Sequence, residues 1–178
     1  MPELSTLPDG VKVFVDTNIF HFHLQGKSMS CTNFITRIAQ RKIEAFVNTE
    51  VLSDLLHKLM LTEASSKGLT KDMKVPPLKE YLQKHRGQTI SLKDYQAQFE
   101  AIIKIGLHVL PINKRLLIDT KFERSAYNLM TNDSLHLGCM NRYIVKRMPT
   151  PLQDIVTYDG DFEHITGVTV WKPDDIVP

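Results

Sequence analysis

The chain has 178 residues, of which 42% are hydrophobic and 24% are charged, and its formal net charge is +2 at pH 7. This composition excludes a disordered chain and suits one globular domain over residues 1–178 with a sizeable core. The near-neutral charge permits a local basic patch but does not by itself indicate a nucleic-acid partner. Cys31 and Cys139 form no C-x-x-C motif, which favours two reduced, buried thiols over a zinc knuckle or a disulfide framework.

The apolar segments give no indication of a membrane. Residues 1–10 carry Glu3 and Asp9, where a signal peptide would need a positive start and an apolar stretch. The longest apolar segment, residues 101–112, is interrupted by Lys104 and is too short to span a bilayer. We therefore expect a soluble, cytoplasmic protein without a membrane partner.

The first predicted strand, residues 11–15, ends in an acid. An apolar run with little alternation is typical of a buried strand in a parallel sheet, and Asp16, Thr17 and Asn18 follow it directly. Ligands of open α/β sheets bind at the carboxyl ends of the strands. Asp16 therefore lies where such a sheet binds its ligands, which makes it a candidate functional residue.

A predicted helix at 32–41 and a predicted strand at 43–47 lead to the clearest helix of the sequence, residues 49–60. Its apolar residues recur at the i, i+4, i+8 spacing of an amphipathic helix, while Glu50 and Asp54 share the other face. The helix dipole explains Glu50 in the first turn, whereas aspartate has poor propensity in mid-helix. A functional role therefore favours Asp54 and keeps Glu50 in reserve.

Residues 63–106 are predicted to form a basic helical insertion. Residues 63–98 carry seven Lys or Arg and four Asp or Glu, a local excess of 7 minus 4, or +3. Pro76 and Pro77 are expected to stop any helix, a short helix is expected at 78–85, and Ser91 is expected to cap the next helix. A solvated insertion and a phosphate-contacting surface explain the excess equally well.

A third strand is predicted at 107–112 and a long helix after Asn113. In that helix Ile118, Phe122, Ala126 and Leu129 recur every three or four residues, so we expect them to form one buried stripe.

The last third of the chain adds further acids. Asp133 lies in the opening turn of a helix. A negative charge there stabilises the helix by about 0.3 to 1 kcal/mol through the helix dipole, whether or not the residue has a function. A strand at 155–158 then ends at Asp159, with Asp161 two residues on, and a last strand follows at 167–171. The alternation of strands and helices predicts a three-layer α/β/α fold with a central parallel sheet.

The acids occupy comparable positions and could converge on one edge of such a sheet. Two carboxylates about 4 Å apart repel by roughly 4 kcal/mol at an effective dielectric constant near 20, so a cluster needs cations or protons. Oxygen ligands without Cys or His suit Mg²⁺ or Mn²⁺ better than Zn²⁺. Such an ion lowers the pKa of a bound water enough for the water to attack phosphorus.

Four motifs follow one another along nearly the whole chain: FVDTN at 14–18, TEVLSDLL at 49–56, TNDSL at 131–135 and VTYDGDF at 156–162. Together they resemble the PIN-domain ribonucleases, in particular the VapC toxin group and related archaeal PIN proteins. The resemblance implies a PIN-like fold and an endoribonuclease that depends on Mg²⁺ or Mn²⁺ and cuts RNA by metal-activated water.

The resemblance also implies roles for individual residues. The catalytic acids are matched by Asp16, Asp54, Asp133 and Asp159, and the metal ligands by Asp16, Asp133, Asp159 and Asp161. The polar positions that orient the first acid are matched by Thr17, Asn18 and Thr157. The helix acid of this family is usually glutamate, so Asp54 is one methylene shorter and Glu50 stays in reserve.

Several interpretations of the function stay open. The resemblance suggests a homodimer, and either a toxin with an antitoxin partner or a housekeeping PIN protein. A catalytically weak or inactive PIN scaffold that binds RNA or protein is an alternative, motivated by Asp54 and the basic insertion. A metal-dependent phosphatase ranks last, because Asn18 stands where a phosphoaspartyl enzyme would carry its second acid.

Overall fold

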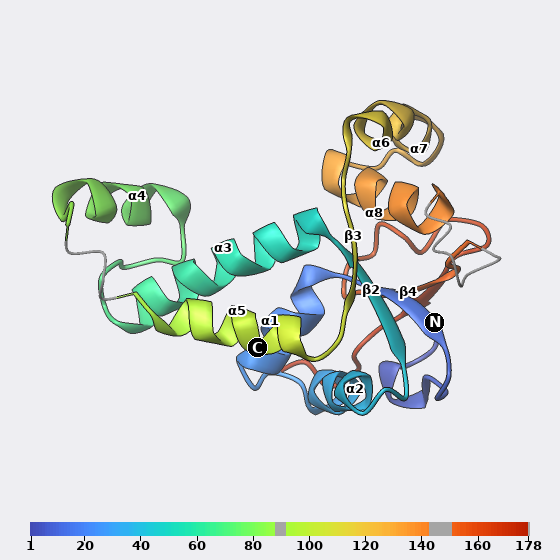
Figure 1. Cartoon of the computed structure of the whole chain (residues 1–178), viewed down its shortest axis with the longest axis horizontal. Helices are drawn as coiled ribbons and strands as arrows, with labels where there is room; N and C mark the ends of the chain where they lie inside the picture. Colours follow the sequence, from blue (N-terminus) through green and yellow to red (C-terminus); the bar gives the residue numbers. More distant parts are fainter. Residues whose placement is uncertain (88–91, 143–150, 178) are drawn as a thin grey trace.

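The structure, a computed structural model, describes residues 1–87, 92–142 and 151–177 (Figure 1). Its strands form one parallel sheet in the order β3-β2-β1-β4-β5. The strands are β1 (Lys12–Val15), β2 (Glu44–Asn48), β3 (His108–Leu110), β4 (Asp154–Val156) and β5 (Thr169–Trp171). The helices are η1 (Leu4–Thr6), α1 (Thr17–Leu24), α2 (Met29–Ala39), α3 (Thr49–Ser66), α4 (Val75–Lys84), α5 (Asp94–Lys104), α6 (Lys114–Asp119), α7 (Lys121–Tyr127) and α8 (Thr131–Arg142).

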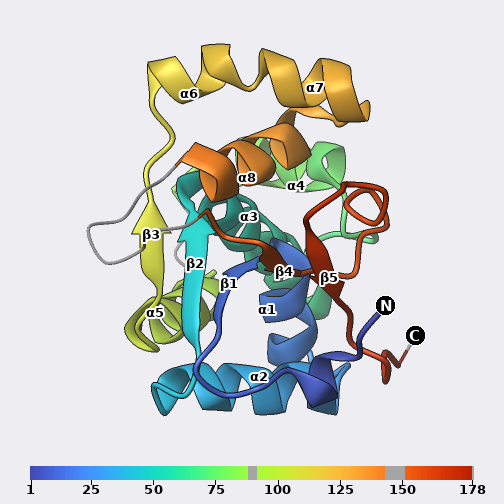
Figure 2. The same cartoon turned by 90° about the vertical axis from the view of Figure 1, so that its right-hand side faces the viewer.

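The strand order explains the layers. The connections from β1 to β2 and from β2 to β3 step toward the same edge, so right-handed crossovers place α1, α2, α3 and α5 on one face. The connection from β3 to β4 returns across the sheet and carries α6, α7 and α8 to the other face. Figures 1 and 2 show these three helices gathered in one group, away from α2 and α5. The expected three-layer α/β/α fold with a central parallel sheet is confirmed.

The central strand β1 is fully buried, as its apolar run indicates. Val13, Phe14 and Val15 have no exposed area and belong to the main apolar core. The helix predicted from residue 49 begins there, because Asn48 caps it by accepting a hydrogen bond from the Val51 backbone at 2.9 Å. It continues beyond residue 60 to Ser66.

Helix α4 stands apart from the sheet and packs against the outer half of α3 (Figure 1). Its contact is a small apolar cluster, separate from the main core, that contains Leu61, Ala64, Leu78 and Leu92. The helix expected at 78–85 is present, but it begins earlier than expected, because Pro76 and Pro77 do not precede it. They lie in the first turn of α4, where a proline leaves no intrahelical hydrogen bond unmade.

A buried carboxylate ties α5 to α3. Glu63 on α3 accepts hydrogen bonds from the backbone of Lys93 at 3.0 Å and of Tyr95 at 2.7 Å. These bonds use donor groups at the start of α5, which have no partner within the helix. Ser91, expected to cap this helix, lies outside the described residues.

The long helix expected after Asn113 was wrong, because the chain bends at Thr120 and forms two short helices. Ile118 is 61% exposed and Phe122 is 64% exposed, so the expected buried stripe faces outward. Ala126 is exposed as well, whereas Leu129, the last residue of the expected stripe, is buried in the segment between α7 and α8.

Close packing on α8 explains the bend. Leu116, Thr120 and Glu123 are the buried side chains of α6 and α7. A Cβ atom on Gly138 of α8 would lie 2.3 Å from the Thr120 Cγ2, so the glycine is what lets the two helices approach. The buried Glu123 also forms an ion pair with Arg142 at the end of α8.

The remaining expectations concern cysteines and membranes. Cys31 and Cys139 are both free and buried, as expected, and burial raises the pKa of each thiol to about 11. No helix within residues 1–87, 92–142 and 151–177 has the length and apolarity needed to cross a membrane.

The C-terminal segment is held to the start of α2 by Asp175. Its carboxylate accepts hydrogen bonds from the Ser28 hydroxyl at 2.5 Å, and from the Ser30 hydroxyl at 2.6 Å and backbone at 2.8 Å. Partial burial alone would raise the pKa of Asp175, but these hydrogen bonds outweigh it and lower the pKa to about 2.

Replacing Gly138 tests the packing at the bend. We expect Gly138→Ala to lower the free energy of unfolding by about 1 to 3 kcal/mol, because the new methyl group meets the Thr120 methyl. In a Thr120→Ser background that methyl is absent, and the same change should be neutral or stabilise by up to about 1 kcal/mol through helix propensity. Urea unfolding of the wild type, the two single variants and the double variant measures the coupling free energy between Gly138→Ala and Thr120→Ser. Additive changes in the free energy of unfolding would contradict the contact.

Asp175 predicts a pH dependence of stability. Its folded-state pKa of about 2 lies below the ordinary value of 3.8, so the ionised group stabilises the fold above that ordinary value. The contribution is lost as the pH falls toward about 2. We expect Asp175→Asn to cost about 1 to 3 kcal/mol at neutral pH. The difference from wild type should shrink in acid, whereas Asp174→Asn should show no such trend; a difference independent of pH would contradict this role.

Candidate active site

Asp16 ends β1 and caps α1, and neutral donors surround its carboxylate. One oxygen accepts a hydrogen bond from the Thr17 backbone at 2.6 Å. The other accepts from the Asn18 amide and from the Thr157 hydroxyl, each at 2.7 Å. Asp16 and Thr157 follow the paired strands β1 and β4, where the sheet order changes direction. Ligands of α/β sheets bind at such a point.

The same hydrogen-bond network orders the loop after β4. The Thr157 hydroxyl, which is fully buried, also accepts from the Asp159 backbone at 3.0 Å. The Asp159 carboxylate in turn accepts from the Asp161 backbone at 3.2 Å, as in an Asx turn. Both aspartates are exposed at the mouth of the site.

Asp133 joins these acids from the opening turn of α8. Burial raises its pKa to about 6, and the charges of Asp159, Asp161 and Asp16 raise it as well. A carboxylate responds in this way only to charges that lie close to it. The structure thus brings the strand-end acids and the α8 acid to one edge of the sheet.

Of the two candidate acids on α3, Glu50 lies 3.7 Å from the Nε2 atom of His136, which itself lies 3.9 Å from Asp16. Its carboxylate accepts a hydrogen bond from the Asn132 amide at 2.7 Å. Burial raises the pKa of Glu50 to about 7, and the charges of Asp54, Asp16 and Asp133 add to this effect. A helix start would lower the pKa of a carboxylate, so burial and repulsion outweigh the helix dipole here.

Asp54 lies one turn further along α3 and forms an ion pair with Lys58 at 2.9 Å. This i, i+4 pair gives a mid-helix aspartate a structural explanation of its own. Asp54 still contributes negative charge to the site, because it raises the pKa of Glu50.

A histidine that the sequence reasoning missed lies between the two carboxylates. His136 on α8 is only 3% exposed, and its Nε2 atom lies 3.9 Å from Asp16 and 3.7 Å from Glu50. Burial lowers the pKa of His136 although the charges of Asp16 and Asp54 raise it. The ring is therefore neutral at physiological pH and carries one proton.

The cap of α3 determines which nitrogen carries that proton. Asn48 uses its side-chain oxygen to accept from Val51, so its amide nitrogen faces His136 Nδ1 at 3.0 Å and must donate. Nδ1 is then an acceptor, and the ring proton is on Nε2. His136 consequently presents an N–H group to Asp16 and Glu50.

One signal in the sequence could have identified His136. It stands three residues after Asp133, and residues three apart lie on the same face of a helix. The partnership with Asn48 carries no such signal, because 88 residues separate the two. Asn132, which donates a hydrogen bond to Glu50, stands out in the sequence only as part of the TNDSL motif at 131–135.

The donor chemistry of the site fits a hard divalent cation, although its side chains do not form a finished ligand set. Among residues 1–87, 92–142 and 151–177, no three His, Cys, Asp or Glu side chains form a group that could hold a metal ion. The acids nevertheless crowd enough to raise the pKa of Asp133 and Glu50. Crowded carboxylate oxygens suit Mg²⁺ or Mn²⁺.

Comparisons with known proteins find similarity in three dimensions. No protein-family model and no curated protein sequence matches the chain. The structure of VapBC2 from Rickettsia felis, bound to a DNA fragment from the promoter, aligns with a TM-score of 0.54 at 13% identity over 92% of this chain and 99% of that chain. A toxin-antitoxin complex from Klebsiella pneumoniae aligns with a TM-score of 0.51 at 14% identity over 88% and 95%.

At these identities the likeness concerns the fold, and it spans nearly the whole chain. It agrees with the four motifs that resemble VapC-type PIN domains. The chain therefore has the three-layer, PIN-like fold that its motifs indicate.

Proposed function

We propose that this chain is an endoribonuclease that depends on Mg²⁺ or Mn²⁺ and hydrolyses RNA phosphodiester bonds. One observation carries the proposal: acids from the end of β1, from α3, from α8 and from the loop after β4 share one edge of the sheet, where burial and then their mutual repulsion raise the pKa of Asp133 and Glu50. Without counter-charge such a cluster is costly, so it favours a ligand that brings cations.

The residues of the candidate active site would have different roles. The ion would be held by Asp16, Asp133, Asp159 and Asp161, and when bound it supplies a Lewis acid that activates water and neutralises phosphate charge. The donors around Asp16 fix that carboxylate in one orientation. Glu50, held by Asn132, would orient the water or the scissile phosphate. Asp54 adds negative charge from the next turn of α3.

We also propose a protein antitoxin as a partner, because both similar structures are described as VapBC or toxin-antitoxin complexes. A homodimer and a cytoplasmic location belong to the same proposal. The alternative, a PIN scaffold that binds RNA without cutting it, is favoured by the incomplete ligand set and by the Lys58 partner of Asp54.

Substitution of the acids tests the nuclease directly. We expect Asp16→Asn to lower RNA cleavage with Mn²⁺ by more than about 100-fold, since removing a residue that merely supports a metal ligand already costs about 10- to 100-fold. Chelation should abolish cleavage, and Glu50→Gln should cost more than Asp54→Asn. Gel assays on labelled RNA measure the rates, with the exposed Asp174→Asn as control. Cleavage that survives Asp16→Asn or chelation would overturn the proposal.

His136 is expected to act as a positioning residue. His136→Phe keeps a ring but removes the Nε2–H group, so we expect kcat to fall by about 10- to 100-fold with little change in KM. The half-saturating Mn²⁺ concentration should rise, because Asp16 and Glu50 lose the N–H group that lies 3.9 and 3.7 Å from them.

The conservative variant separates this role from packing. His136→Gln retains an N–H donor and should recover part of kcat relative to His136→Phe, and thermal unfolding confirms that both variants are folded at the assay temperature. Equal activity of the Phe and Gln variants would show that the donor has no such role.

A further inference from the structure

A groove leads away from the acid cluster along α3. It consists of two adjoining cavities of about 330 and 390 Å³, which share His57 and Val75. The first cavity begins at Asp54 and Lys58, and the second extends to Arg86 beyond the end of α4. We call this depression the α3–α4 groove.

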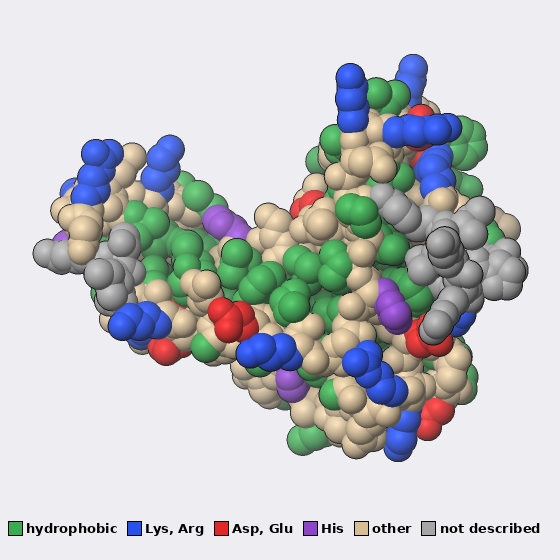
Figure 3. Space-filling model, viewed as in Figure 1, with side chains coloured by type: hydrophobic (Ala, Val, Ile, Leu, Met, Phe, Trp, Pro, Cys, Tyr) green, Lys and Arg blue, Asp and Glu red, His purple; other side chains and the backbone are tan. Residues whose placement is uncertain are grey.

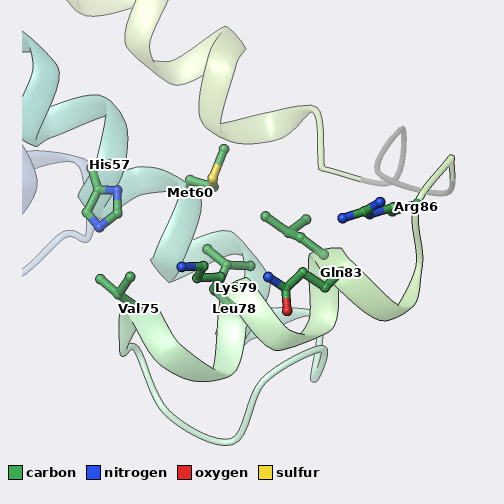
Figure 4. A pocket seen from close by; sticks show the side chains of 8 residues that line it. His57, Met60, Val75, Leu78, Lys79, Gln83 and Arg86 are labelled. Carbon is green, nitrogen blue, oxygen red and sulfur yellow. The ribbon is translucent and has the colours of Figure 1, made fainter.

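The groove has an apolar floor and a basic edge. Met60 from α3 and Leu78 and Leu82 from α4 line the second cavity, and its charged lining residues are Lys79 and Arg86. Figure 4 shows His57 and Met60 on one wall and Val75, Lys79 and Gln83 on the other. In Figure 3, hydrophobic side chains gather where α4 meets α3, and Lys and Arg side chains lie on the outer part of α4.

We propose that the α3–α4 groove binds a single RNA strand beside the bond that is cut. Apolar surface flanked by Lys and Arg complements a single strand, whose bases can pack on the floor while its phosphates meet the cations. A duplex keeps its bases stacked inside and cannot use such a floor. The inference rests on the proposed function, since it assigns a substrate-binding surface to the same site.

Continuity with the acid cluster favours RNA over other occupants. Asp54 lines the groove and lies one helical turn from Glu50, so a strand that leaves the site along α3 enters the groove directly. From Glu50 to Met60 the helix rises about 15 Å. The groove would therefore add affinity only for RNA that extends beyond the cut along α3.

The cations of the groove are placed to follow such a strand. Lys58 lies where the groove meets the site, Lys79 lies on α4, and Arg86 lies at the far end. Part of the excess of Lys and Arg in residues 63–98 would therefore contact the phosphates of a strand that runs along α3, away from the acids.

Binding and cleavage are measured separately. The Asp16→Asn chain, with chelator present, is titrated into a fluorescent single-stranded 12-nucleotide RNA and into the same RNA in a duplex. Fluorescence anisotropy gives Kd at several salt concentrations. We expect tighter binding of the single strand. Adding Lys79→Glu and Arg86→Glu should weaken it by about tenfold or more and lower the salt slope by about 0.7 for each phosphate that the variant no longer neutralises.

Matched variants control for charge and folding. Lys71→Glu makes the same charge change on a lysine that lines neither cavity of the groove, and its Kd should stay within about twofold of the parent. Lys79→Ala removes the cation without adding an acid and should weaken binding less than Lys79→Glu. Thermal unfolding confirms that each variant is folded.

The outcomes distinguish the groove from the nuclease. If the wild-type chain cuts RNA while the groove variants bind RNA as the parent does, the groove proposal is overturned and the nuclease stands. If the groove variants lose RNA binding but the wild-type chain cuts no RNA, the groove stands and the nuclease fails. Equal binding of duplex and single strand overturns the groove proposal. A groove that instead mediates self-association, seen by light scattering as a monomer only in the variants, overturns it as well.

Discussion

The mutual repulsion of carboxylates at the carboxyl edge between β1 and β4 is the constraint on which the site depends. The raised pKa of Asp133 and of Glu50 records that repulsion together with burial. The chain offsets part of it with neutral donors: the hydroxyl of Thr157 and the amide of Asn18 donate to Asp16, and the amide of Asn132 donates to Glu50. These donors are neutral, so they fix the orientation of the carboxylates without cancelling their negative charge. That charge can still attract a cation.

One hydrogen-bonded chain joins this site to the fold. Asn48 ends β2, caps α3 and donates to His136 on α8, so one side chain connects a strand and two helices. The His136 ring also packs against Phe14 of β1, with ring centroids 5.3 Å apart. The position of Glu50 on α3 relative to Asp133 on α8 is therefore coupled to the packing of the core.

Helix α4 depends on contacts of its own. The apolar cluster that joins it to α3 is separate from the main core, and the buried Glu63 ties the same part of α3 to α5 through backbone groups. The acid cluster lies at the edge of the sheet, whereas the groove beside it lies between α3 and α4. Substitutions in α4 can therefore change what the groove binds without changing the sheet.

The sequence by itself determined the parallel sheet, the strand-end position of Asp16 and the order of the four motifs. Those features follow from local patterns, namely an apolar strand and the alternation of strands with helices. The tertiary structure alone decided which groups meet: the contact of Asn48 with His136 spans 88 residues, and no local pattern records it. It also decided that the chain bends at Thr120, because the absence of a Cβ atom on Gly138 lets Thr120 approach α8 and turns Ile118 and Phe122 outward. Periodicity identifies an apolar stripe, but only the packing partner determines which side is buried.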